Sequence, residues 1–207
     1  MKKVIDCTKN VNTLIHKRLK EVTVEEGLAI ATELFQILNE RKDGIGLAAN
    51  QVGIDAQVAV VNVREPLVLI NPKIVKKDNE IKYYEGCLSF PSKGVHTKRY
   101  ETIEVKTEQV EGSWIFSGVE TGGGKGSWES DDSKNSRDLR LLEAVCVQHE
   151  IDHLNGIVCM DRKIDTTYRA EKKIGRNELV TIKKGDAVKV LKYKKVKNLL
   201  NEGWVIE

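Results

Sequence analysis

The stretch QHEIDHLNG, residues 148–156, places two histidines four residues apart, with a glutamate directly after the first. Positions i and i+4 of an α-helix lie on one face, so His149 and His153 can present two ring nitrogens to a single ion. Glu150 would lie beside that ion without binding it, which suits a general base acting on water whose pKa the ion lowers from about 15.7 to roughly 7. The stretch predicts a metal-binding helix, and the plainer alternative is a helix whose histidines only pack or face solvent.

The rest of the chain alternates helical and strand-like patterns. The helical spacing around the histidines begins at Leu139, and Gly156 can end that helix in the left-handed conformation. An earlier helix is expected from a capping box formed by Thr23 and Glu26, with its end near residues 42–44. Strand-like runs lie at residues 57–63, 67–75, 81–84 and 101–107. Their short connections favour antiparallel pairing.

A metal held by two histidines needs a third ligand, and two cysteines are candidates. Cys159 lies three residues after Gly156, where some zinc peptidases place a third histidine, but its apolar neighbours GIVCM favour a buried strand and a core thiol. Cys87 lies in EGCLSFP, residues 85–91, where glycine and polar neighbours favour presentation from a loop. The chemistry favours Cys87 and leaves Cys159 open.

The segment GIGLAANQVG, residues 44–53, follows the first helix directly. Its glycines and alanines allow the backbone to approach another group closely, and Gln51 supplies an amide at its end. It does not fit a nucleotide-binding loop, because the third glycine is missing and the segment follows a helix rather than a strand. A tight packing turn is the plainer alternative.

The composition favours an intracellular protein. The 207 residues suit one domain, or one domain with an appendage, with 40% hydrophobic and 31% charged residues. No apolar run approaches the roughly 18 residues of a membrane span, and the start lacks the apolar core of a secretory signal. Four scattered cysteines are typical of reduced thiols, and a net charge of +3 gives no argument for specific DNA binding. We therefore expect a cytoplasmic protein without a membrane partner.

Taken together, GIGLAANQ, EGCLSFP and QHEIDH resemble the three signature motifs of peptide deformylases, in the same order, over residues 1–162. The resemblance implies an α+β fold with antiparallel β-sheets packed around a central metal-binding HExxH helix. It implies Cys87, His149 and His153 as ligands of one divalent ion per chain, with Cys159 in the core. Fe2+ is the ion expected, with Ni2+, Co2+ or Zn2+ as substitutes. The implied reaction removes the formyl group from the N-terminal formylmethionine of nascent polypeptides and releases formate.

The same resemblance implies roles for other residues. Glu150 would move the proton, while the Gln51 amide and the backbone N–H of Leu88 would stabilise the developing oxyanion. Glu85 and Arg99 would brace the metal loop as an ion pair. The residues implied in peptide binding are Ile45 and Gly46, through their backbone, and Leu142, Val145 and Cys146, which would form the pocket for the methionine side chain. Core packing is the plainer alternative for the last three.

Several features depart from the family pattern. Many bacterial members have an arginine three residues after the motif proline, where this chain has Gly94, so peptide affinity or specificity can differ. Residues 111–138 are rich in Gly, Ser and Asp and are expected to form a long loop excursion.

Residues 163–207 form a basic C-terminal appendage, in which two strands, a short helix and a final strand are expected. Its lysines could contact ribosomal RNA. The plainer alternative is that they only form a solvated face. They are Lys183, Lys184, Lys189, Lys192, Lys194, Lys195 and Lys197.

Two other functions compete with deformylation. A zincin-like HExxH metallopeptidase would use nearly the same water chemistry but would cleave internal bonds and would not need Cys87. A binding protein on an inactive enzyme scaffold is the second alternative, and the presence of every motif residue argues against it.

Overall fold

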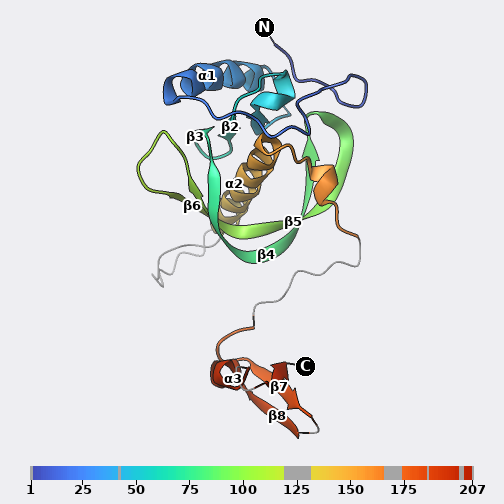
Figure 1. Ribbon diagram of the computed structural model, residues 1–207, viewed down its shortest axis with the longest axis vertical. Helices are drawn as coiled ribbons and strands as arrows, with labels where there is room; N and C mark the ends of the chain where they lie inside the picture. The colour runs from blue at the N-terminus through green and yellow to red at the C-terminus, as the bar shows by residue number, and fades with distance from the viewer. Residues whose placement is uncertain are drawn as a thin grey trace. The chain divides into compact units, whose positions relative to one another are not determined.

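The computed structural model of the chain describes residues 2–41, 43–118, 132–165, 174–185, 187–200 and 203–206. The chain divides into two compact units, Met1–Ala170 and Glu171–Glu207. The first unit contains all three motifs. Its elements, drawn in Figure 1, are α1 (Val24–Glu40), β1 (Gly46–Ala48), a 3-10 helix (Ala49–Val52), β2 (Val58–Asn62), β3 (Pro66–Ile70), β4 (Lys73–Cys87), β5 (Phe90–Lys106), β6 (Trp114–Ser117), α2 (Asp132–Leu154) and a second 3-10 helix (Cys159–Arg162).

The predicted capping box starts α1. The N–H of Glu26 donates to Oγ1 of Thr23 over 3.2 Å, and the N–H of Thr23 donates to the Glu26 carboxylate over 3.0 Å. Two N–H groups that the first turn leaves without helical partners are satisfied in this way. The helix begins at Val24 and ends at Glu40, two residues before the expected end.

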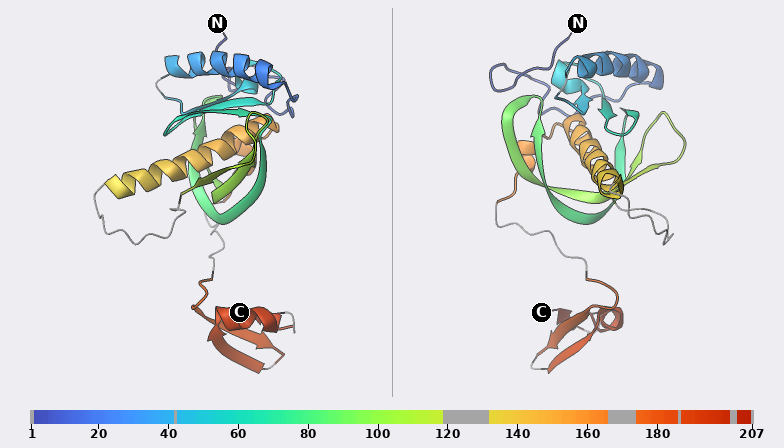
Figure 2. Two further views of the ribbon diagram at one scale, coloured as in Figure 1. Left: turned by 90° about the vertical axis from the view of Figure 1, so that its left-hand side faces the viewer. Right: turned by 180° about the vertical axis from the view of Figure 1, so that it is seen from behind.

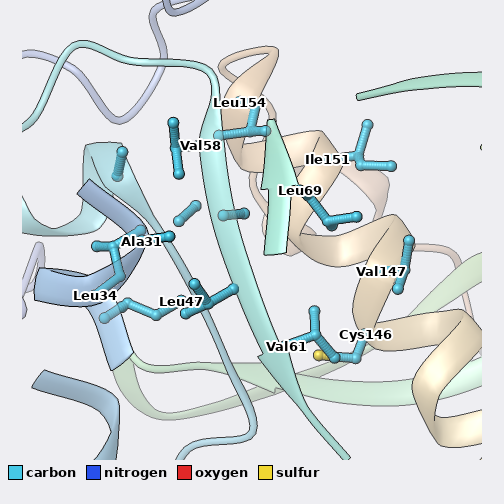
Figure 3. Close-up of a cluster of buried hydrophobic side chains, with 14 of the residues drawn as sticks. Ala31, Leu34, Leu47, Val58, Val61, Leu69, Cys146, Val147, Ile151 and Leu154 are labelled. Atoms are coloured by element: carbon cyan, nitrogen blue, oxygen red, sulfur yellow. The ribbon is translucent and has the colours of Figure 1, made fainter. Parts of the chain in front are cut away.

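A small antiparallel sheet lies between the two long helices. Its order is β1-β2-β3, and α1 and α2 cover its opposite faces (Figure 3). Because both faces are covered, the first four residues of the central strand β2, Val58–Val61, are all buried and do not alternate with polar residues. Leu34 of α1, Leu69 of β3 and Leu154 of α2 are fully buried in the same core.

A second antiparallel sheet, in the order β4-β5-β6, curves around α2 (Figures 1 and 2). Its long hairpin turns through Leu88 and Ser89, so that Cys87 pairs with Phe90. The amide of the buried Gln148 fastens α2 to β5, because it accepts from the N–H of Tyr100 and donates to the Tyr100 carbonyl. The hairpin thus carries Cys87 to the histidine face of α2.

The structure corrects three local expectations. Strand β6 and the first turns of α2 lie inside residues 111–138, where a loop was expected; of that segment, residues 119–131 lie outside the described residues. Cys159 begins a 3-10 helix instead of a strand, since four residues suffice for the turn that returns the chain to β5. Cys87 is the last residue of a strand instead of a loop residue, because the connection to β5 is only two residues long.

The second unit has a small sheet of its own. It contains β7 (Leu179–Lys184), β8 (Ala187–Lys192), α3 (Tyr193–Leu200) and β9 (Val205–Ile206), in the sheet order β8-β7-β9. The expected succession of two strands, a helix and a strand is present. Ile182, Val196 and Trp204 form its core together with Val180. Across the described residues of both units, no helix has the length and apolar character needed to cross a membrane.

Candidate metal centre and active site

Three potential metal ligands meet at the end of the β4–β5 hairpin. The Sγ atom of Cys87 lies 3.3 Å from Nε2 of His153, and this nitrogen lies 3.2 Å from Nε2 of His149. The ligand atoms of these three residues all lie within 4.8 Å of one another, close enough to share one ion. No other such group is found among the residues that the structure describes. A soft thiolate and two imidazoles are ligands that zinc and iron accept. The helical spacing of the histidines therefore brings their nitrogens together, as the sequence predicts.

Hydrogen bonding fixes the orientation of one imidazole. Nδ1 of His149 lies 2.7 Å from Oε2 of Glu85, which leaves Nε2 directed at the other two ligands. Burial raises the pKa of Glu85, but hydrogen bonds from His149 and Arg99 outweigh it and bring that pKa down to about 2. Burial also holds the pKa of His153 well below its usual range, so this imidazole is neutral and its lone pair is available.

A chain of charged groups continues from Glu85 to the surface. The Arg99 guanidinium is almost fully buried and donates to both oxygens of Glu85, over 2.7 and 3.0 Å. It also lies 2.5 Å from Oδ2 of Asp152, which in turn accepts from the partly exposed Arg162. The pairing of Glu85 with Arg99 was expected, whereas Asp152 and Arg162 were not. For Asp152, the sequence offers one indication, which is an acidic residue between the two histidines of HEIDH.

Glu150 is buried beside the ligand group. Its Oε2 atom has no hydrogen-bond partner, which is unusual for a carboxylate removed from solvent. Burial is the main reason that the pKa of Glu150 is raised to about 7. A carboxylate with this pKa can both accept and donate a proton near neutral pH. The unpaired oxygen and the converging ligands fit a site that holds an ion and a water molecule.

The segment GIGLAANQ forms the opposite wall of the site. Oε1 of Gln51 accepts from the N–H of Ala48 over 2.8 Å, which directs Nε2 towards Sγ of Cys87 and Oγ of Ser89, at 3.6 and 3.3 Å. A Cβ atom at Gly46 would lie 2.7 Å from Sγ of Cys146 and closer still to Oε1 of Glu150. Glycine is therefore required here for its small size, since Gly46 lies in strand β1 and not in a turn. Ser89 is a contact that the sequence reasoning missed.

A cleft of about 740 Å³ opens beside the ligand group. Residues expected to bind the peptide line it, namely Ile45, Gly46, Leu142, Val145 and Cys146, and so do Gln51, Glu85, Cys87, Leu88, His149 and Glu150. Arg99 lies behind this wall as the buried partner of Glu85. The cleft is large enough for a short peptide and reaches the ligands.

Cys159, the alternative third ligand, lies near the site without belonging to the ligand group. The neighbouring Cys159 thiol, together with burial, raises the pKa of the Cys87 thiol, and the side chain of Cys159 is almost fully buried. Among the described residues, the group that can share an ion contains Cys87 and the two histidines. The core position that the resemblance implies for Cys159 agrees with this burial.

Fold and site together define a metal-dependent hydrolase: an α+β protein with antiparallel sheets, a cysteine–histidine–histidine group and a buried carboxylate beside a peptide-sized cleft. The sequence pattern described as polypeptide deformylase matches residues 1–169. This chain belongs to the polypeptide deformylase family, whose members remove formyl groups from peptides.

Individual relatives support the same assignment. A peptide deformylase of Dictyoglomus thermophilum is 38% identical over 132 residues, which are 63% of this chain and 73% of the relative. One of Aquifex aeolicus is 31% identical over 160 residues, 73% of this chain and 82% of its own.

The fold is likewise similar to solved deformylase structures. The crystal structure of the Thermotoga maritima peptide deformylase superposes with a TM-score of 0.62 at 29% identity, covering 80% of this chain and 99% of that one. A probable peptide deformylase of the Synechococcus phage S-SSM7 gives a TM-score of 0.59 at 27% identity, covering 78% of this chain and 99% of the other.

Proposed function

We propose that this chain removes the formyl group from the N-terminal formylmethionine of nascent polypeptides. The observation that carries the proposal is the convergence of Cys87, His149 and His153 next to Glu150, beside a peptide-sized cleft. Because formylated nascent chains occur where ribosomes translate, we place the enzyme in the cytoplasm.

Cys87, His149 and His153 would hold one divalent ion, for which we propose Fe2+, with Ni2+, Co2+ or Zn2+ as substitutes. When bound, the ion would polarise the formyl oxygen and make water a better nucleophile at neutral pH. The neutral imidazole of His153 and the Glu85-oriented imidazole of His149 suit this use. The thiol of Cys87 would have to lose its proton when the ion binds.

Glu150 is the group that we propose to move the proton. It would accept a proton from water as the water oxygen adds to the formyl carbon, and would deliver it to the peptide nitrogen as the C–N bond breaks. Formate and a free N-terminal amine are the products. Support comes from the raised pKa of Glu150, about 7, and from its unpaired buried oxygen.

The oxygen that becomes negative during the addition would accept hydrogen bonds from Nε2 of Gln51 and from the backbone N–H of Leu88. Gln51 is suited to this role because its other amide atom is already held by the Ala48 N–H. Its orientation is therefore fixed before substrate arrives, and little reorganisation is needed during the reaction.

The peptide would bind in the extended form along Ile45 and Gly46, whose backbone groups would pair with it as a neighbouring strand does. Leu142, Val145 and Cys146 would surround the methionine side chain, since they line the cleft one and two turns before His149 on α2. This placement puts the formyl group next to the ligands and the rest of the peptide towards the cleft entrance.

A formate-release assay under reducing, anaerobic conditions tests the proposal. With added Fe2+ or Ni2+, the protein should release formate from formyl-Met-Ala-Ser and nothing from the matched acetyl-Met-Ala-Ser peptide. The zincin-like alternative predicts internal cleavage of both peptides and unchanged activity after Cys87→Ala. Internal cleavage without formate release would reject the deformylase function.

We further propose that residues 1–162 contain the whole catalytic domain and that residues 163–207 contact the ribosome. The lysines of β7 and β8 support the second part, although Lys189 is also engaged by the ring of Trp204, at 4.5 Å. Residues 166–173, where a truncation at Thr167 would be made, lie outside the described residues. Salt-sensitive pelleting with ribosomes that is lost on this truncation would support the contact, and unchanged pelleting would reject it.

A further inference from the structure

Tyr84 is a large aromatic side chain at the rim of the cleft that the reaction does not use. It lies on β4, three residues before Cys87, and lines the same cleft as the metal ligands. The residue is 61% exposed, although the neighbouring Glu85 and Cys87 are buried. A single exposed aromatic residue is ordinary on a protein surface, so its position needs a specific reason to matter.

The partner strand holds the Tyr84 ring in place. Tyr84 is opposite His96 in the β4–β5 ladder, and their rings make an edge-to-face contact with centroids 5.0 Å apart. Gly94, on the same face of β5, is the diagonal neighbour of Tyr84. A Cβ atom at Gly94 would lie closer than 3.0 Å to three atoms of the Tyr84 side chain. The tyrosine therefore lies across the glycine, and only a residue without a side chain permits this.

The distance along β4 places Tyr84 within reach of a bound peptide. Strand residues rise about 3.3 Å each, so Tyr84 lies roughly 10 Å along β4 from Cys87. An extended peptide advances at nearly the same rate. When its formyl group is at the ligand group, its third residue is level with the tyrosine and its second residue lies just before that level. Phe90 and Pro91 line the cleft as well, followed along β5 by Ser92, Lys93 and Gly94.

We propose that Tyr84, held across Gly94, is a specificity residue that binds an apolar or aromatic side chain at the second or third position of the formylated peptide. The inference rests on the proposed function, because it assumes that a formylated terminus lies at the ligand group. The ring offers a face for stacking and loses little conformational freedom on binding, since His96 and Gly94 already restrict it. Deformylation of peptides with such residues is thereby favoured over deformylation of short or polar ones.

Steady-state kinetics on two substrates test the proposal. Formyl-Met-Leu-Phe reaches the tyrosine, whereas formyl-methionine amide does not. Tyr84→Ala should raise KM for the tripeptide by up to about tenfold, and Tyr84→Phe should retain the wild-type value. Neither variant should change kcat or the kinetics of the amide, and metal content should stay the same.

Gly94→Ala provides a second, independent variant. Its methyl group displaces the exposed Tyr84 ring without disturbing a buried contact, so the protein should fold and lose the same preference for the tripeptide. In the Tyr84→Ala background, Gly94→Ala should have no further effect. Equal losses on both substrates, or unchanged KM in Tyr84→Ala, would overturn the proposal. If the wild type released formate from neither substrate, the deformylase function itself would fail, and this inference with it.

Discussion

Oε2 of Glu85, on β4, lies 2.7 Å from Nδ1 of His149, on α2, so the two elements that bring the candidate metal ligands together are joined beside the candidate metal site itself. Glu85 is two residues before Cys87, and its carboxylate is held in turn by the buried Arg99. One carboxylate thus orients the histidine and fixes the end of the strand that carries the cysteine of the candidate ligand group.

Arg99→Ala should weaken metal retention by about 10–100-fold, because it removes the cation that fixes Glu85 and, through it, His149. It also leaves the carboxylates of Glu85 and Asp152 buried with less compensation, so stability should fall by roughly 3–5 kcal/mol. Metal content after dialysis against a chelator, together with thermal unfolding, measures both effects. Arg64→Ala is the matched control, because it breaks the ion pair with the buried Glu143 away from the ligands and should leave metal content unchanged.

Arg162→Ala should have a milder effect of the same kind. Arg162 donates to Asp152 from a partly exposed position, and Asp152 keeps its contact with Arg99 in the variant. We expect a loss in metal affinity smaller than that of Arg99→Ala, with kcat of the fully loaded enzyme unchanged. A metal titration of the two variants side by side checks the order, and equal losses would contradict the proposed chain of contacts.

Glu85→Gln should change how stability depends on pH. The pKa of Glu85 is about 2 in the folded protein and about 4.5 in the unfolded chain, so its contribution is present above pH 4.5 and is lost as the pH falls towards 2. That contribution is about 3 kcal/mol at neutral pH. Urea unfolding of the metal-free protein from neutral pH to about pH 3 should give a flatter dependence for the variant. Parallel curves would show that Glu85 gains nothing from its partners.

Glu150→Gln should lower kcat by about 100- to 10,000-fold, because the amide cannot accept the proton of the attacking water. Glu150 is not part of the ligand group, so metal content should remain at the wild-type level. The similar size of glutamine keeps the packing against Gly46. Activity within a few-fold of the wild type, with full metal content, would assign the proton transfer to another group.

Gly46→Ala should also impair catalysis, for a steric reason. The added methyl group would press on the Glu150 carboxylate and on Sγ of Cys146. Both side chains are buried and cannot move into solvent, so the carboxylate should be displaced from its position. We expect reduced kcat with normal metal content in a formate-release assay. An unaffected kcat would indicate that the site has more room than the packing around Gly46 implies.

The sequence predicts much of this arrangement because several signals are local. The capping box at Thr23, the glycine at position 156 and the four-residue spacing of His149 and His153 depend only on near neighbours along the chain. Residue chemistry alone favours Cys87 as the third metal ligand but leaves Cys159 open. The resemblance of the three motifs together to the family implies Cys87. The Cys87 thiol does meet both histidines.

Other features depend on contacts between distant segments. Asp152 and Arg162 enter the site only because α2 lies against the β4–β5 sheet. The two-residue turn after Cys87 and the position of Tyr84 across Gly94 depend on the register of that hairpin, which no short stretch of sequence specifies. Strand β6 has only four residues and lies in a polar, glycine-rich segment. A pattern this short does not identify a strand from the sequence.

X-ray absorption spectroscopy of the Zn2+- or Ni2+-loaded protein tests the shared metal site most directly. The wild type should show one sulfur ligand at about 2.3 Å and two imidazole nitrogens at about 2.0–2.1 Å. Cys87→Ser should lose the sulfur signal, whereas Cys159→Ser should keep it, although the Cys159 thiol is near enough to raise the pKa of Cys87. A sulfur ligand that persists in Cys87→Ser, or disappears in Cys159→Ser, would contradict the assignment of Cys87, His149 and His153 as the metal ligands.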